Sequence, residues 1–130
     1  MINLHEAQFA ELLSSNFGWL KVPRAFFHML KINEALFLAQ IIDLHYKALR
    51  ENKISKDGWF YASQDYIFDI TSLTKFQQRQ CKKVLIDKLM VEAELQGVPS
   101  KLYYKLKWKN IAKAIQKDEE IILQKGAKYI

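Results

Sequence analysis

The chain has 130 residues, of which half are apolar and 13% aromatic, enough for one domain with a buried core and too many for a disordered chain. One cysteine, Cys81, excludes an internal disulfide and a multi-cysteine zinc site, and no apolar run reaches the roughly 18 residues of a membrane span. The net charge of +6 favours nucleic acid or another anionic surface as a partner.

The N-terminal segment predicts one helix and a short helical turn. Residues 4–13 show loosely helical apolar spacing, with Asn3 as the cap, and Pro23 is placed to open a short turn. The first twenty residues contain no lysine or arginine. Their large apolar side chains, which exceed what a peripheral helix needs, are Phe9, Leu12, Leu13, Phe17 and Trp19. This apolar surplus favours a homodimer.

A long helix is expected from Asn33, which is a good N-cap and is followed by Glu34 in the first turn. Apolar residues then recur with a period of about 3.6 residues up to Leu49, so this helix is predicted to be largely buried. Residues 50–58 are polar and turn-like. The aromatic run at 59–62 is typical of a short strand.

Two further helices are predicted in the middle of the chain. Ser63 is placed to cap a short helix over residues 64–69, and a tight connection leads from it to a longer helix. The longer helix is expected to begin after Thr74 and to run to about Met90, because Thr74 and Gln77 fit the capping-box pattern.

Strict period-two alternation follows in two segments. Residues 91–96 alternate apolar side chains with Glu or Gln, and residues 101–109 alternate apolar side chains mainly with lysine, across a Gly-Val-Pro-Ser turn. This pattern predicts a β-hairpin with one buried face and one basic face. A last helix is expected after Asn110 as its cap, with apolar positions up to Leu123.

The middle of the chain therefore reads helix, strand, short helix, tight turn, longer helix and hairpin. This is the order of a winged helix-turn-helix, in which the second helix of the pair enters the major groove and the hairpin is the wing. The predicted fold class is mainly α with a small β-hairpin (α+β). The single domain is expected to cover 1–130, with an N-terminal helix in 1–20, the winged-helix core in 33–109 and a C-terminal helix in 110–130.

The charge is unevenly distributed. Residues 1–70 carry 7 basic and 8 acidic groups, residues 71–113 carry 10 and 3, and residues 114–130 carry 3 of each. The whole positive excess thus falls in and beside the predicted second helix and hairpin. Lysines that serve only solubility are usually spread more evenly, although chance clustering on a solvated face is the alternative interpretation.

Candidate DNA-binding residues lie on the outer side of the predicted second helix and on the hairpin. Because Cys81, Val84 and Leu85 are assigned to the core, the long polar side chains are expected to point the other way. Arg79 is suited to read guanine and Gln78 to read adenine, while lysine and threonine suit phosphate oxygens. The full candidate set is Ser72, Thr74, Lys75, Gln78, Arg79, Lys82, Lys83, Lys101, Lys105 and Lys107.

Several short motifs carry a resemblance to a known family. They are Gly58-Trp59-Phe60-Tyr61, Thr-Lys-Phe-Gln-Gln-Arg at 74–79, Lys82-Lys83-Val84-Leu85, and Gln-Gly-Val-Pro-Ser-Lys at 96–101 with Tyr103-Tyr104. With these motifs the chain resembles the winged helix-turn-helix N-terminal domains of phage and plasmid replisome organiser and replication initiator proteins of Gram-positive bacteria. In that family a glycine is common near the end of the recognition helix, where this chain has Leu89-Met90.

The resemblance implies double-stranded DNA as the partner, with replication proteins as further partners. It implies a role in replication initiation, with transcriptional regulation as the alternative role. The rival from a different class is a protein-interaction module that docks on another protein and whose lysines only increase solubility.

Other chemistry is not expected. The three histidines fall in different predicted elements and have no metal-ligand spacing, so no metal, cofactor or catalytic residue is expected, and the chain is not expected to be an enzyme. Cys81 on the inner side of its helix is expected to act as a small hydrophobic residue rather than as a redox sensor. The N-terminus lacks the basic start and apolar core of a signal peptide, which favours a cytoplasmic protein with no membrane partner.

Overall fold

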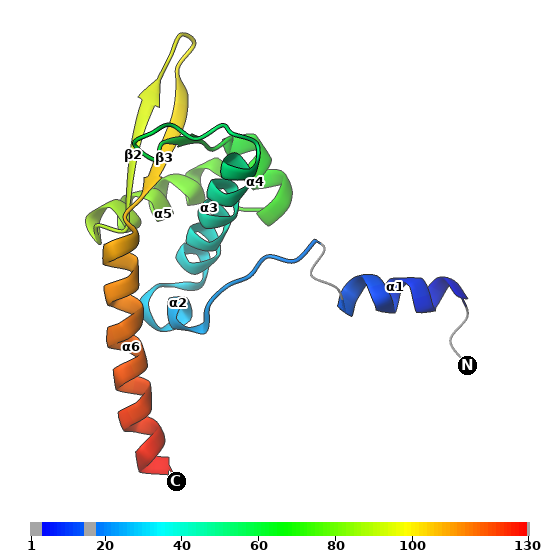
Figure 1. The fold of residues 1–130 in the computed structure, drawn as a ribbon, viewed down its shortest axis with the longest axis vertical. Helices are drawn as coiled ribbons and strands as arrows, with labels where there is room; N and C mark the ends of the chain where they lie inside the picture. The colour runs from blue at the N-terminus through cyan, green and yellow to red at the C-terminus, as the bar shows by residue number, and fades with distance from the viewer. Residues whose placement is uncertain (1–3, 15–17, 130) are drawn as a thin grey trace.

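A long helix, α3 (Ile32–Arg50), is the centre of the fold (Figure 1). The computed structural model describes residues 4–14 and 18–129. The other elements are α1 (Leu4–Ser14), α2 (Arg24–Met29), β1 (Phe60–Tyr61), α4 (Gln64–Thr71), α5 (Lys75–Asp87), β2 (Val91–Gln96), β3 (Lys101–Leu106) and α6 (Trp108–Tyr129). Helices α2, α4 and α5 and strand β1 pack against α3, whereas α1 is set apart from this body in Figure 1.

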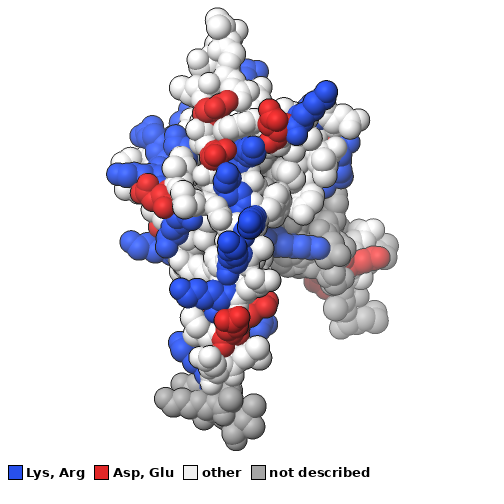
Figure 2. Space-filling view, turned by 60° about the vertical axis from the view of Figure 1, so that its left-hand side comes forward, with Lys and Arg blue, Asp and Glu red and all other residues white. Residues whose placement is uncertain are grey.

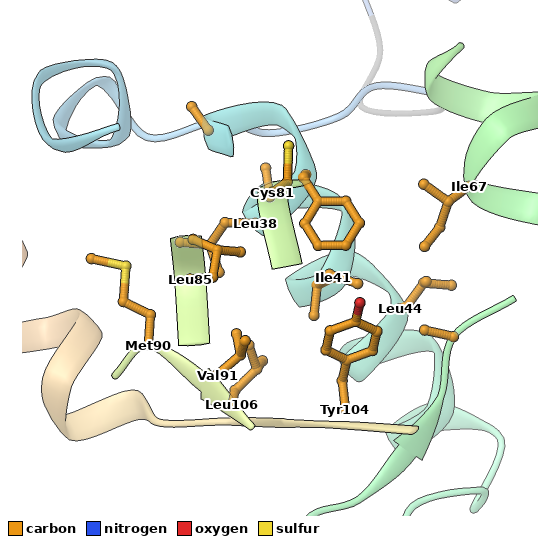
Figure 3. Packing of buried hydrophobic residues seen from close by; sticks show 14 of the residues in the cluster. Leu38, Ile41, Leu44, Ile67, Cys81, Leu85, Met90, Val91, Tyr104 and Leu106 are labelled. Carbon is orange, nitrogen blue, oxygen red and sulfur yellow. The ribbon is translucent and has the colours of Figure 1, made fainter. Parts of the chain in front are cut away.

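The core forms around α3 because apolar side chains occupy several sides of this helix. Leu38 and Ile41 are fully buried, with Leu85 of α5 and Tyr104 of β3 close to them (Figure 3). Burial of each such aliphatic side chain contributes about 1.5–3 kcal/mol. The prediction of a largely buried helix is confirmed, although Leu49 in its last turn is exposed.

The start of α3 differs from the expectation. The helix begins at Ile32, so Asn33 lies inside it and is not the N-cap. Glu34 does lie in the first turn, where its carboxylate accepts a hydrogen bond from the Lys31 N–H at 3.0 Å. That bond satisfies a backbone donor that the helix itself leaves unpaired. No helix in the described residues is both long and apolar enough to cross a bilayer.

The expected cap of α1, Asn3, lies outside the described residues. Of the side chains behind the homodimer expectation, Phe9 and Trp19 are exposed. The remaining three, Leu12, Leu13 and Phe17, are outside the described side chains.

The sheet has three antiparallel strands in the order β1-β3-β2. In this register Val91 lies opposite Leu106, and Phe60 of β1 lies opposite Tyr104. All four side chains are buried, which confirms both the hairpin and its apolar face. The far half of the hairpin extends beyond the body of the molecule (Figure 1).

Helix α5 ends at Asp87, earlier than expected, through a Schellman motif. The Met90 N–H donates to the Leu85 carbonyl and the Leu89 N–H donates to the Ile86 carbonyl, both at 2.9 Å. Leu89 is left-handed, with a φ of 60°. That conformation is strained for leucine and is the one for which glycine is preferred at a helix end. It falls where the resembled family commonly has its glycine.

We expect Leu89→Gly to raise the free energy of unfolding by about 0.5–1 kcal/mol, as measured by urea denaturation. The substitution removes the left-handed strain, and Leu89 is 65% exposed, so little buried surface is lost. Leu89→Ala is the matched control and should bring no comparable gain, because alanine keeps the Cβ. A loss of stability in Leu89→Gly would contradict the strain argument.

Helix α6 begins two residues before Asn110, so the expectation that Asn110 caps it is wrong. Asn110 instead donates from Nδ2 to the Leu89 carbonyl at 2.7 Å and ties α6 to the end of α5. The helix packs against α2, where His28 Nδ1 lies 3.0 Å from Asp118 Oδ2. The apolar positions near Leu123 are exposed, because α6 continues past the other described elements (Figure 1).

Candidate nucleic-acid interface

Helices α4 and α5 form the helix-turn-helix, and local hydrogen bonds define both helix starts. Ser63 Oγ accepts from the Tyr66 N–H at 3.2 Å. At the start of α5, Thr74 Oγ1 accepts from the Gln77 N–H at 3.1 Å, while Gln77 Oε1 accepts from the Thr74 N–H at 2.9 Å. Both capping predictions are confirmed, and each bond satisfies an otherwise unpaired donor.

Cys81 and Leu85 are buried on the inner face of α5 as expected, but Val84 is only partly buried and Gln78 is buried in addition. Gln78 was expected to point outward, but only 2% of it is exposed. Its Nε2 donates to the Gln64 carbonyl at 3.0 Å and to the Leu73 carbonyl at 2.9 Å. Gln78 therefore joins the start of α4 and the turn to α5, and the expectation that it reads adenine is wrong. The reason is the position of α4, which covers the flank of α5 that Gln78 occupies.

The outward side of α5 carries a row of long side chains. Successive residues of a helix are rotated by about 100°, so the row can be found as the residues that lie on the side opposite Gln78, Cys81 and Leu85. The row consists of Phe76, Arg79, Gln80 and Lys83, all exposed. We call it the α5 outer row. Within the described chain, neither Arg79 nor Lys83 has a carboxylate partner, so their donors are available to a ligand.

Two members of the outer row, Phe76 and Gln80, were missing from the candidate set. The helical periodicity of α5 contains the signal, because Phe76 and Gln80 lie opposite Gln78, Cys81 and Leu85, but reading it requires Gln78 rather than Val84 to be placed on the inner face. Once Gln78 is buried, Phe76 lies directly outward in the first turn.

The remaining candidates near the turn lie outside the α5 outer row, and several of them are half-buried or already bonded to neighbouring groups. Ser72 ends α4 in the left-handed region, with a φ of 64°, and is exposed. Thr74 is exposed, but its hydroxyl serves the helix cap. Lys75 Nζ lies 3.1 Å from Asp65 Oδ1 in an exposed pair, which contributes little to stability. Lys82 is half-buried at the edge of the inner face.

The solvent face of the hairpin has mixed charge. Glu92 lies opposite Lys105 in the register, and Lys107 Nζ lies 3.5 Å from Glu92 Oε1. Glu94 lies opposite Tyr103 on the same face. The expectation of one basic face is therefore wrong, because β2 contributes Glu92 and Glu94 to the same face as the lysines of β3. Figure 2 shows basic side chains over this side of the molecule, with acidic ones among them near the hairpin.

One small pocket lies between the candidate DNA-binding residues of the helices and those of the wing. It has a volume of about 160 Å³ and lies between the starts of α4 and α5 and the beginning of β3. Lys75 and Lys101 both line it, together with Asp65. The Lys101 ammonium also lies 5.2 Å from the centre of the Tyr61 ring, a cation–π contact that holds it beside the sheet.

Cys81 lies on the buried side of α5, as expected. Burial raises the pKa of its thiol to about 11, and the nearby Glu34 carboxylate adds to this shift. The thiol therefore stays protonated near neutral pH, which is typical of a small hydrophobic residue and not of a reactive thiolate.

No protein-family model matches the chain, and no curated protein matches it. Two solved structures are similar in fold. One is described as "N-Terminal domain of DNA binding protein", with a TM-score of 0.57 and 18% identity over 92% of this chain and 94% of that one. The other is described as "Structure of Rep-DNA complex", with a TM-score of 0.57 and 16% identity over 82% of each chain. These likenesses and the element order together show that the chain has a mainly helical, α+β winged helix-turn-helix fold.

Proposed function

We propose that the chain binds double-stranded DNA, with α5 in the major groove and the hairpin against the backbone or the minor groove. The observation that carries this proposal is the α5 outer row, where Arg79 and Lys83 project from the second helix of the helix-turn-helix without a carboxylate partner. Arginine and lysine in this place suit base edges and phosphates. Support also comes from the fold neighbours, of which one is described as the N-terminal domain of a DNA-binding protein and one as a Rep–DNA complex.

The proposed role is replication initiation, and transcriptional control is the alternative role. The Rep–DNA neighbour and the resemblance to phage and plasmid initiators favour replication. The proposal includes a homodimer, which the exposure of Phe9 and Trp19 favours. A two-fold dimer would bring two α5 helices to half-sites about one DNA turn apart. Replication proteins are the further partners in this proposal.

The proposal is tested by fluorescence anisotropy with labelled duplexes at several salt concentrations. The double variant Arg79→Glu and Lys83→Glu reverses two charges on the α5 outer row and should weaken binding at least about tenfold. The variant Lys113→Glu and Lys117→Glu makes the same change in net charge on α6 and should weaken binding much less. Equal losses in the two variants would mean that only net charge matters and would contradict the proposed interface.

We expect the wing lysines to affect affinity more than specificity. Replacing Lys101 or Lys105 with alanine should weaken binding to all duplexes alike and flatten the plot of log affinity against log salt by about 0.9 per lost phosphate contact. Lys107→Ala should have the smallest effect, because Glu92 already partners Lys107. Lys117→Ala on α6 is the control. Unchanged affinity in Lys101→Ala and Lys105→Ala would remove the wing from the interface.

The alternative function, docking on another protein, is favoured by one observation. Phe68 and Ile70 of α4 are exposed, which leaves apolar surface on the first helix of the helix-turn-helix. A docking module without DNA binding would pass a heparin column early and would not shift random duplex DNA in a gel. Retention on heparin together with a gel shift favours the DNA-binding function.

A further inference from the structure

Phe76 is the most exposed phenylalanine among the described residues, with 60% of its surface accessible. It lies in the first turn of α5, one turn before Arg79 and Gln80 along the outer row. Phenylalanine is a weaker helix former than lysine, arginine or glutamine, and at this position it contributes little to the core. Neither helix propensity nor folding therefore explains an aromatic ring at this place.

The position of Phe76 indicates what it contacts. In a helix-turn-helix, residues at the N-terminal end of the second helix approach the base edges, and later residues lie nearer to the phosphates. The major groove displays hydrogen-bonding groups on every base pair but only one apolar group, the 5-methyl of thymine. A ring that projects into the groove beside the polar fork of Arg79 is complementary to that methyl group.

We propose that Phe76 is a specificity-determining residue that recognises thymine through an apolar contact with its 5-methyl group. The inference rests on the proposed function and adds a preference for thymine to the guanine recognition proposed for Arg79. Phe76 and Arg79 lie about one turn of α5 apart. Recognition of guanine by Arg79 and of thymine by Phe76 would together define part of a half-site.

The experiment uses the full chain and short duplexes that the chain itself recovers from a random pool. Thymines in the recovered duplex are replaced one at a time by deoxyuridine, which differs only by lacking the methyl group. The wild-type chain should bind about fourfold more weakly when the contacted thymine is replaced, the loss expected for one buried methyl group. Phe76→Ala should bind the thymine and deoxyuridine duplexes equally well.

The control variant is Phe27→Ala, which removes an exposed phenylalanine of α2, outside the helix-turn-helix. It should keep the full preference for thymine. Circular dichroism checks that both variants are folded, as expected from the exposure of both rings. A preference for thymine that survives in Phe76→Ala would overturn the inference.

Failure of the proposed function and failure of the Phe76 inference give different experimental results. A chain that recovers no duplex from the pool contradicts the proposed function itself. A chain that recovers duplexes but binds every thymine and deoxyuridine pair equally contradicts only the role of Phe76. If Phe76→Ala bound DNA as the wild type does but no longer bound a partner protein, thymine recognition would likewise be overturned.

Discussion

Gln78→Ala is expected to lower the free energy of unfolding by about 2–4 kcal/mol. The amide of Gln78 donates to the carbonyls of Gln64 and Leu73, so its removal takes away two hydrogen bonds at the joint between α4 and α5. It also leaves a cavity under the turn, because the side chain is fully buried. Urea denaturation followed by circular dichroism measures the change.

Two companion variants separate the causes. Gln80→Ala changes the same residue type on the exposed side of the same helix and should stay within about 0.5 kcal/mol of the wild type. Gln78→Met keeps the volume but loses both donors, so its loss of stability reports the hydrogen bonds alone. If Gln78→Ala were as stable as Gln80→Ala and lost DNA affinity instead, the buried position of Gln78 would be wrong.

Features that depend on neighbouring residues were predictable from the sequence. The caps at Ser63 and Thr74 need only a hydroxyl and a backbone N–H three residues further on, so the pattern that predicts them also forms them. The hairpin was predictable for a similar reason, because its alternation matches the period of a strand and its turn joins adjacent segments.

The rotation of α5 was not predictable from its own sequence. Gln77 and Gln78 are adjacent and chemically identical, and about 100° of helix rotation separates them. Only the packing of α4 against one flank of α5 decides which of them is buried. This single choice moves Gln78 out of the candidate interface and brings Phe76 and Gln80 into it.

The mixed charge of the wing was also predictable, because glutamates alternate in residues 91–96 of the same hairpin, whereas the exposed end of α6 depends on long-range contacts. The lysines of β3 lie on a basic face only if β2 supplies no acidic partner, and the register places Glu92 opposite Lys105. Along α6, the apolar residues 121–123 follow a pattern that indicates burial, but no described element covers them. An apolar pattern shows that a partner would be favourable, not that the fold provides one.

Arg79→Ala is expected to weaken binding to the preferred duplex by about 1–3 kcal/mol and binding to random duplexes much less. Arg79 lies in the α5 outer row, one turn after Phe76, where its planar guanidinium can meet the O6 and N7 acceptors of one guanine. Because the side chain is exposed and no described carboxylate pairs with it, the variant should fold normally. Anisotropy titrations with the two kinds of duplex give the specificity ratio.

Charge and geometry are separated by Arg79→Lys, which keeps the positive charge but loses the two-pronged donor. It should bind random duplexes almost as well as the wild type and still lose most of the preference for the recovered duplex. Arg50→Ala removes an exposed arginine at the end of α3, outside the helix-turn-helix, and should leave the specificity ratio unchanged. If a folded Arg79→Ala protein kept the wild-type ratio, base reading would have to come from other residues, and α5 would contribute only phosphate contacts.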